Sequence, residues 1–329
     1  MPSGYTHMIL TKLATEGLTK KNLDLQELLQ EHQKYLRLGS VAPDIAYSQE
    51  IKGPLSNETE IADVLHYNQT NQIPLRALKE IKKIDNITEK ETAFAFFTGY
   101  ITHIVADGII HPFVRDKVGD YNIGNNAKEH RILEMKLDVL FLNHLSGLEL
   151  NYTNIHDGML SPLEVSFDHI SSLFSELINE IYYKLISMKE IEVWIKGLHL
   201  LFSCAESNNN GFYSKLAMFK NFLFPQLKDL IEKQNNYLVL KIDEHKGADK
   251  NFANKEIHFI NDCIPQFQQT ILPIIIKSYN FVFQDMPEVT ESDIPAINLD
   301  TGRELKILSS YTKIRKGEKL EEEVIFWKG

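Results

Sequence analysis

Two histidines and an aspartate recur every fourth residue in an otherwise apolar stretch, residues 99–113, "GYITHIVADGIIHPF". Because an α-helix has about 3.6 residues per turn, His103, Asp107 and His111 fall on one face of the predicted helix. A buried imidazole or carboxylate needs a partner, since stranding a polar group costs roughly 1–3 kcal/mol. Two arrangements satisfy all three side chains. They can bind a divalent metal ion together, or form a His–Asp–His hydrogen-bonded string inside a helix bundle.

A second pair of potential ligands, His130 and Glu134 in "KEHRILEMKLD", has the same four-residue spacing. Polar pairs at this spacing are also common on solvated helix faces, so the pair alone fits either a site or a surface. Asp138 continues the stripe, as a supporting partner or as a surface residue. Three further candidates stand in separate segments: His7 in "YTHMIL", Asp44 in "LRLGSVAPDIAY" and His66 in "VLHYN".

The chemistry of these donors indicates a cluster of metal ions. Asp44 follows helix-breaking residues and is predicted to lie in a loop, where it either caps the next helix or binds metal. Taken together, the imidazoles and carboxylates outnumber the four ligands that one zinc ion takes. Donors of these two kinds, with no thiolate among them, favour Zn²⁺ or a similar divalent ion. The alternative to an enzyme is a non-catalytic helical protein. In such a protein the same residues hold a structural metal ion or satisfy one another by hydrogen bonds.

The elements that must position these residues are helices. Apolar residues recur three and four apart along most of the chain, which predicts an all-α protein. A soft division separates a metal-binding core, residues 1–160, from a helical continuation or closely packed second domain, residues 161–329. Short strands are expected only in the tail, where "LDTG" reads as a turn. Helices are predicted over residues 10–18, 25–38, 61–67, 75–84, 93–118, 130–145, 165–188, 193–202, 213–241 and 255–284.

Charge, cysteine content and the lack of a signal segment indicate which binding partners and which cellular compartment to expect. The formal net charge of −10 argues against stable binding to duplex nucleic acid, which relies on lysine and arginine at the phosphates. Cys204 and Cys263 match neither a zinc ribbon nor a disulfide framework, and buried free thiols are expected. No secretory signal and no long apolar run is present, so a cytoplasmic protein is the default. The oligomeric state is not readable.

The ordered motifs "THMIL", "GSVAPDI", "LHYN", "GYITHIVADGIIHP" and "EHRILE" resemble the zinc-dependent phospholipase C family, over about residues 1–150. The fungal and plant single-strand nucleases share that fold and its trinuclear site. The resemblance implies a multi-helix bundle with three zinc ions in a cleft, here with extra C-terminal helices. One zinc would take Asp44, His66, His103 and Asp107; a second would take His111, His130 and Glu134; the third would take His7, Asp107 as a bridge, and the N-terminal amine and carbonyl.

The same resemblance implies a function. The expected activity is phospholipase C-like hydrolysis of a phospholipid or other phosphodiester with two or three zinc ions, leaving room for peripheral membrane contact. Asp44 is the candidate for orienting the attacking water or accepting its proton. A single-strand nuclease or nucleotidase on the same metal core is the closest alternative. The chain lacks the N-terminal tryptophan of secreted members, and the interval from Asp44 to His66 is longer than in compact ones.

Overall fold

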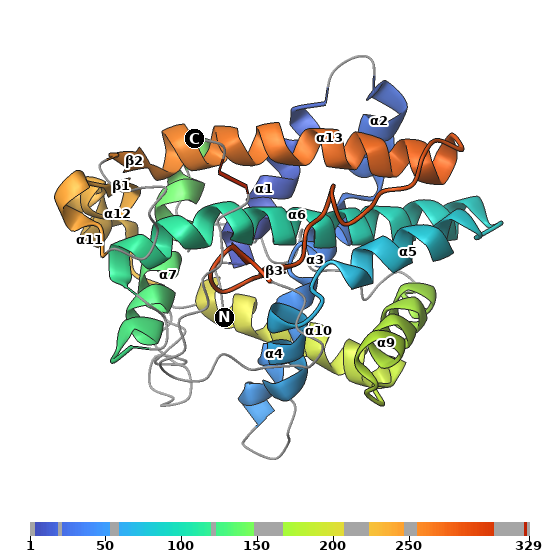
Figure 1. Cartoon of the computed structure of the whole chain (residues 1–329). Coiled ribbons are helices and arrows are strands. Elements are labelled where there is room, and N and C mark those ends of the chain that lie inside the picture. Colours follow the sequence, from blue (N-terminus) through green and yellow to red (C-terminus); the bar gives the residue numbers. More distant parts are fainter. Residues whose placement is uncertain are drawn as a thin grey trace.

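The fold is built around one long buried helix, α6 (Ile87–Val118), which carries the His–Asp–His stripe. In Figure 1 it runs through the middle of the molecule. The helix begins where the Asn86 side chain accepts hydrogen bonds from the N–H groups of Thr88 and Glu89, a regular N-cap. It ends at Gly119, whose positive φ of 99° suits glycine. Although α6 is long and apolar enough to span a membrane, its apolar window is wholly buried inside the protein.

The computed structural model describes residues 4–18, 22–52, 59–119, 123–147, 167–206, 224–246, 255–305 and 326–327. The predicted all-α class is confirmed, because helices dominate these residues. The remaining principal helices are α1 (Gly4–Glu16), α2 (Leu23–Glu31), α3 (Gln33–Gly39), α4 (Thr59–Tyr67), α5 (Gln72–Lys82), α7 (Asn126–Ser146), α9 (Asp168–Tyr182), α10 (Met188–Glu206) and α13 (Ile264–Phe283).

Helices from both halves of the chain pack against α6. Helices α3, α5 and α7 contact it, and α13 lies alongside it (Figure 1). One hydrophobic core runs through all of them, from Leu10 of α1 to Ile271 of α13. The predicted buried thiol is confirmed for Cys263, whereas the side chain of Cys204 lies outside the described residues. The proposed boundary at residue 160 also falls outside the described residues.

The segment that carries Asp44 is a 3₁₀ helix, η2 (Ala42–Lys52), rather than the predicted loop. It is held from outside by α10. The Ser48 hydroxyl lies 2.6 Å from the carbonyl oxygens of both Ile45 and Trp194. A Cβ at Gly197 would approach the Ser48 hydroxyl to 2.8 Å, so α10 fits closely onto this segment. Helix α10 therefore positions the stretch of chain that presents Asp44.

Four of the predicted helices differ from the structure. The helix predicted over residues 165–188 ends at Tyr182, and residues 183–187 are not helical. The stretch 25–38 is split at His32 into α2 and α3. Residues 213–241 are not one helix: residues 213–223 lie outside the described part, and the rest is divided into short elements that include Asn235 and Asn236, which are weak helix formers. Residues 255–284 begin as a strand and a π-turn, so α13 starts only at Ile264. The short elements here are α11 (Leu227–Leu230), η8 (Ile231–Lys233), α12 (Asn235–Leu238), β1 (Val239–Leu240), η9 (Ile242–Glu244), β2 (Ile257–His258) and η10 (Phe259–Cys263).

Two small antiparallel hairpins complete the fold. The first pairs β1 with β2, which the sequence pattern did not predict, because each strand has only two residues. The second pairs β3 (Ile297–Asn298) with β4 (Arg303–Glu304). It confirms both the strands expected in the tail and the turn expected at "LDTG", residues 299–302. The other tail segment, residues 321–329, lies almost entirely outside the described residues.

Glycines allow α3 and α6 to meet backbone to backbone. A Cβ at Gly39 would lie 1.8 Å from the carbonyl oxygen of Phe96, and one at Gly99 would lie 2.1 Å from that of Leu36. No side-chain adjustment relieves such a clash, because the obstacle is backbone. The glycines of "GSVAPDI" and "GYITHIVADGIIHP" thus set the distance between the two segments that carry Asp44 and His103.

Gly99→Ala is therefore expected to lower the free energy of unfolding by about 3 kcal/mol, through overpacking against backbone. It should also weaken zinc binding, because the new Cβ would lie 2.7 Å from the Ser40 nitrogen, next to the carbonyl that holds His103. Urea unfolding and zinc titration measure the two effects. Gly124→Ala is the control: it meets nothing within 4 Å and carries only the cost of its positive φ, about 1 kcal/mol. Equal zinc affinity in the two variants would contradict the prediction.

Candidate metal centre

All the candidate ligands predicted from the sequence are buried and lie close together. Each is at most 4% exposed, although they come from α1, η2, α4, α6 and α7. Their donor atoms form three groups, and within each group the atoms lie within 4.8 Å of one another. The groups are His7, His103 and Asp107; Asp44, His66 and His103; and His111, His130 and Glu134.

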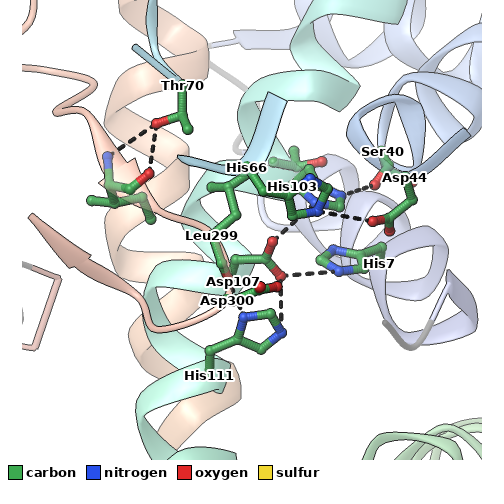
Figure 2. Close-up of polar contacts among 12 residues, drawn as sticks. His7, Ser40, Asp44, His66, Thr70, His103, Asp107, His111, Leu299 and Asp300 are labelled. Atoms are coloured by element: carbon green, nitrogen blue, oxygen red, sulfur yellow. Dashed lines mark hydrogen bonds and ion pairs between the residues drawn. The ribbon is translucent and has the colours of Figure 1, made fainter. Parts of the chain in front are cut away.

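The distances between donors match the geometry of zinc coordination. Four donors placed about 2.0–2.1 Å from a tetrahedral zinc ion lie about 3.3 Å from one another. The Asp107 carboxylate lies 3.2 Å from Nε2 of His7, 2.9 Å from that of His103 and 3.5 Å from that of His111. Nε2 of His66 lies 3.1 Å from Oδ1 of Asp44. Asp107 therefore reaches imidazoles of all three groups (Figure 2).

The two imidazoles of the third group converge on the carboxylate of Glu134 in α7. A single oxygen, Oε1 of Glu134, lies 2.9 Å from Nε2 of His111 and 3.1 Å from Nε2 of His130. The four-residue spacing of His130 and Glu134 brings them together on α7, as predicted. His111 stands one turn beyond Asp107 on α6, so it links this group to the other two.

Backbone carbonyls fix the orientation of three of the imidazoles. Nδ1 of His103 donates to the Ser40 carbonyl over 2.7 Å, and Nδ1 of His66 donates to the Ala62 carbonyl over 2.8 Å. Nδ1 of His111 donates to the Leu299 carbonyl. These bonds assign the tautomer in which Nε2 carries the free lone pair, and Nε2 is the atom that faces the carboxylates.

Several buried side-chain atoms that could bind a metal ion make no hydrogen bond. Oδ2 of Asp44, Nε2 of His103 and Oδ2 of Asp107 have no hydrogen-bond partner. The last two lie 2.9 Å apart, but they are not oriented as donor and acceptor. Buried polar atoms are normally satisfied, and unsatisfied ones call for an explanation. Lone pairs that converge without bonding one another fit ligands of a shared cation, so the residues present fit the zinc that the resemblance implies.

The charges of the metal-free site depend on one another. Burial on its own would lower the pKa of His66, but the hydrogen bond and charge of Asp44 raise it to about 9. Burial alone would also lower the pKa of His111, but the charge of Asp107 and the charge and hydrogen bond of Glu134 raise it to about 9. Despite burial, neighbouring imidazoles hold the pKa values of Asp107 and Glu134 below their usual range. Burial lowers the pKa of His130.

Of the nearby polar residues, Asp138 has the clearest structural role. It is buried, and its Oδ1 accepts a hydrogen bond of 2.7 Å from the Thr6 nitrogen. It thereby ties α7 to the start of α1, next to His7. Thr102 instead donates to the Gly99 carbonyl, and Glu129 is exposed. Carbonyls, and not these side chains, accept from the imidazoles of His66, His103 and His111.

Sequence reasoning missed the part played by the β3–β4 hairpin. The turn at 299–302 supplies the carbonyl that orients His111, and the Leu299 N–H donates to the His66 carbonyl over 3.0 Å. No sequence signal marks a backbone carbonyl as an acceptor. The N-terminal ligand implied by the family resemblance belongs to residues 1–3, which lie outside the described part.

An all-α fold that gathers buried imidazoles and carboxylates into three groups has the architecture of a multinuclear metal centre. A family model for zinc-dependent phospholipase C matches residues 6–200, more than half of the 329 residues. The chain therefore belongs to the zinc-dependent phospholipase C family, and is a metal-dependent hydrolase. Comparisons with curated proteins and with solved structures gave no match.

Asp107→Asn is expected to remove at least one zinc ion per chain, because Asp107 faces imidazoles of all three donor groups. Elemental analysis after dialysis against buffered zinc measures the loss. Asp116→Asn is the matched control, since Asp116 is another buried carboxylate of α6 but pairs with His245. Unchanged zinc content in Asp107→Asn, alongside a folded control, would show that Asp107 is not a ligand.

The metal-free protein should be most stable at mildly acidic pH. Because folding raises the pKa values of His66 and His111 from 6.5 to about 9, their contribution is complete below pH 6.5 and is lost as pH rises through 9. Folding lowers the pKa values of Asp107 and Glu134, so their contribution is present above the usual carboxylate range and is lost as pH falls. His130, with its lowered pKa, opposes the two histidines below pH 6.5.

Urea unfolding in a chelator at about pH 5.5, 7.5 and 9.5 tests this dependence. The free energy of unfolding should fall toward alkaline pH by an amount on the order of a few kcal/mol. His66→Gln should show a smaller fall, because it removes one of the two groups that titrate. A wild-type protein as stable at pH 9.5 as at pH 5.5 would contradict these protonation states.

Proposed function

We propose that the chain is a phosphodiesterase of the phospholipase C type that uses two or three zinc ions to hydrolyse a phospholipid. The observation that carries the proposal is the set of three buried donor groups joined through His103, Asp107 and His111. The family description names the same metal and the same reaction class. Zinc in such a centre makes water nucleophilic near neutral pH and offsets the negative charge of a phosphate.

We infer different roles for the candidate ligands from the hydrogen bonds that each of them makes. His66 and His103 are fixed by carbonyl acceptors, so they hold position and do not carry protons to substrate. Asp44 differs, because its Oδ1 lies 3.1 Å from His66 while its Oδ2 has no hydrogen-bond partner. We assign to this Oδ2 the role of accepting a proton from the attacking water. General-base catalysis of this kind contributes about 10²–10⁴-fold to the rate.

Two exposed side chains support contact with a lipid surface. Tyr183 and Leu185, in the connection that follows α9, are 91% and 96% exposed. Tyrosine and leucine are residue types that enter the interface of a bilayer. We include peripheral membrane contact in the proposal on that ground, and the substrate is best presented both as vesicles and as a soluble short-chain lipid.

A single-strand nuclease is the second candidate, because two tyrosines stand near a predicted ligand. The rings of Tyr47 and Tyr67 lie 5.2 Å and 6.4 Å from the His66 ring, measured between centroids. Aromatic rings beside a metal centre can stack on bases. Tyr5 cannot serve in this way, because it is fully buried against Phe202 and Phe224. Tyr121, a further candidate from the sequence for stacking on a base, lies outside the described residues.

Release of phosphocholine from phosphatidylcholine, measured beside cleavage of single-stranded DNA, tests the assignment. We expect zinc-loaded protein to cleave the lipid and not the DNA. Asp44→Asn should reduce kcat by about 10²–10⁴-fold while retaining zinc, since an amide oxygen still binds metal but cannot accept the proton. Asp285→Asn, at a carboxylate that is 92% exposed, serves as the control. DNA cleavage alone would replace the proposal with the nuclease, and full activity of Asp44→Asn would remove Asp44 as the base.

A further inference from the structure

The β3–β4 hairpin is bonded to two candidate ligands that belong to different donor groups. The N–H of Leu299, in its turn, donates to the His66 carbonyl over 3.0 Å, and the Leu299 carbonyl accepts from Nδ1 of His111. His66 shares a donor group with Asp44, whereas His111 shares one with Glu134. The hairpin therefore bridges α4 and α6 beside the metal centre, although the stretch that matches the family ends at residue 200.

A single buried hydroxyl, that of Thr70, pairs with the outer edge of β3. Thr70 is fully buried in the connection between α4 and α5, on the same stretch of chain as His66. Its Oγ1 donates to the Ile297 carbonyl over 2.7 Å and accepts from the Ile297 nitrogen over 3.1 Å (Figure 2). One side chain thus satisfies both polar backbone groups of a strand residue, as a neighbouring strand would.

The inner edge of β3 is already paired within the hairpin. The carbonyls of Ala296 and Asn298 accept from the nitrogens of Leu305 and Gly302, each over 2.8 Å. Backbone polar groups of successive residues point to opposite edges of a strand, so those of Ile297 point away from β4. Because Ile297 is fully buried, loss of the Thr70 hydroxyl would leave two backbone groups without a partner, which is strongly unfavourable.

Two further contacts hold the hairpin in place. On the side of α5, Asn71 is buried and donates from Nδ2 to the Ile294 carbonyl over 2.8 Å. On the side of α6, Gly302 has a φ of +68°, and a Cβ there would lie 2.6 Å from Cδ of Pro112. The turn therefore lies between the α4–α5 connection and α6, and a shift of the turn would disturb both of its bonds to the candidate ligands.

We propose that the β3–β4 hairpin is a brace that sets the separation of these two donor groups, and that Thr70 is the positioning residue that anchors it. If the turn moves, the His111 ring loses its orienting acceptor and the backbone of His66 loses its donor, so the Nε2 atoms no longer converge with their carboxylates. The inference rests on the metal centre of the proposed function. By reciprocity, zinc that favours the braced geometry must also stabilise the hairpin.

The first test is zinc affinity, measured by competition with a chelator. Thr70→Val keeps the shape of the side chain but cannot hydrogen-bond, and should weaken the binding of at least one zinc ion by about tenfold, as loss of partners outside the ligand set does. Thr70→Ser keeps the hydroxyl and should bind zinc like wild type. Ser278→Ala is the control for lost stability, since it removes a fully buried hydroxyl that donates to the Ile274 carbonyl within α13.

Equal zinc affinity in Thr70→Val and Ser278→Ala would overturn the anchoring role, as would a Thr70→Ser variant as weak as Thr70→Val. Either result would leave zinc binding and phosphodiester cleavage by the wild-type protein intact, so the proposed function would stand. A wild-type protein that binds no zinc would instead overturn the metal centre, and the brace with it.

Amide hydrogen exchange of the wild-type protein tests the brace without a substitution, and so does not depend on whether a variant folds. Added zinc should slow exchange of the Leu299 N–H at least tenfold more than that of the Lys246 N–H. The Lys246 N–H is the matched control, because it donates to the Asp116 carbonyl over 2.8 Å and so also joins a distant segment to α6. Equal slowing of the two amides by zinc would overturn the coupling of metal to the hairpin.

Discussion

The interaction on which the structure depends is the contact of one buried carboxylate, Asp107, with three imidazoles. An isolated carboxylate in an apolar helix would be strongly destabilising, since burying an ion costs several kcal/mol even after relaxation. Helix α6 can occupy the centre of the core only because α1 brings His7 to this carboxylate while α6 itself contributes His103 and His111. In the metal-free protein, protonated imidazoles balance part of the negative charge of the carboxylates, and zinc would replace those protons. Metal binding and folding are therefore linked through the same atoms.

Close backbone packing then converts this charge arrangement into a defined geometry. Gly39 and Gly99 let α3 approach α6 without side chains between them, and this approach brings the Ser40 carbonyl to Nδ1 of His103. Carbonyl acceptors also hold His66 and His111, so each ring presents Nε2 to the centre. Rigid orientation of ligands by hydrogen bonds to their far nitrogen is a general feature of metal sites. Here the acceptors are backbone atoms, whose placement depends on how the helices and the hairpin pack.

Segments that follow the family-matched region pack against α6 and hydrogen-bond to two of the candidate ligands. Helix α13 lies along α6, and the β3–β4 hairpin is bonded to Thr70, His66 and His111. Gly108 is similarly covered, because a Cβ there would lie 2.1 Å from the Phe326 ring. Chain from the C-terminal part thus packs against α6 beside the candidate ligands. This arrangement gives that part a role that its sequence alone did not suggest.

The sequence by itself determined the helical class and the candidate ligands, because helix periodicity is a local property. His103, Asp107 and His111 share a face whatever packs around them, and His130 and Glu134 are paired by the same spacing on α7. Local pattern also identified the turn at 299–302. It could not predict the two-residue strands β1 and β2, the 3₁₀ form of the Asp44 segment, or the interrupted helix within 213–241. Only the tertiary structure decided that the Ser40, Ala62 and Leu299 carbonyls orient the imidazoles, because contacts between distant segments leave no periodicity in the chain.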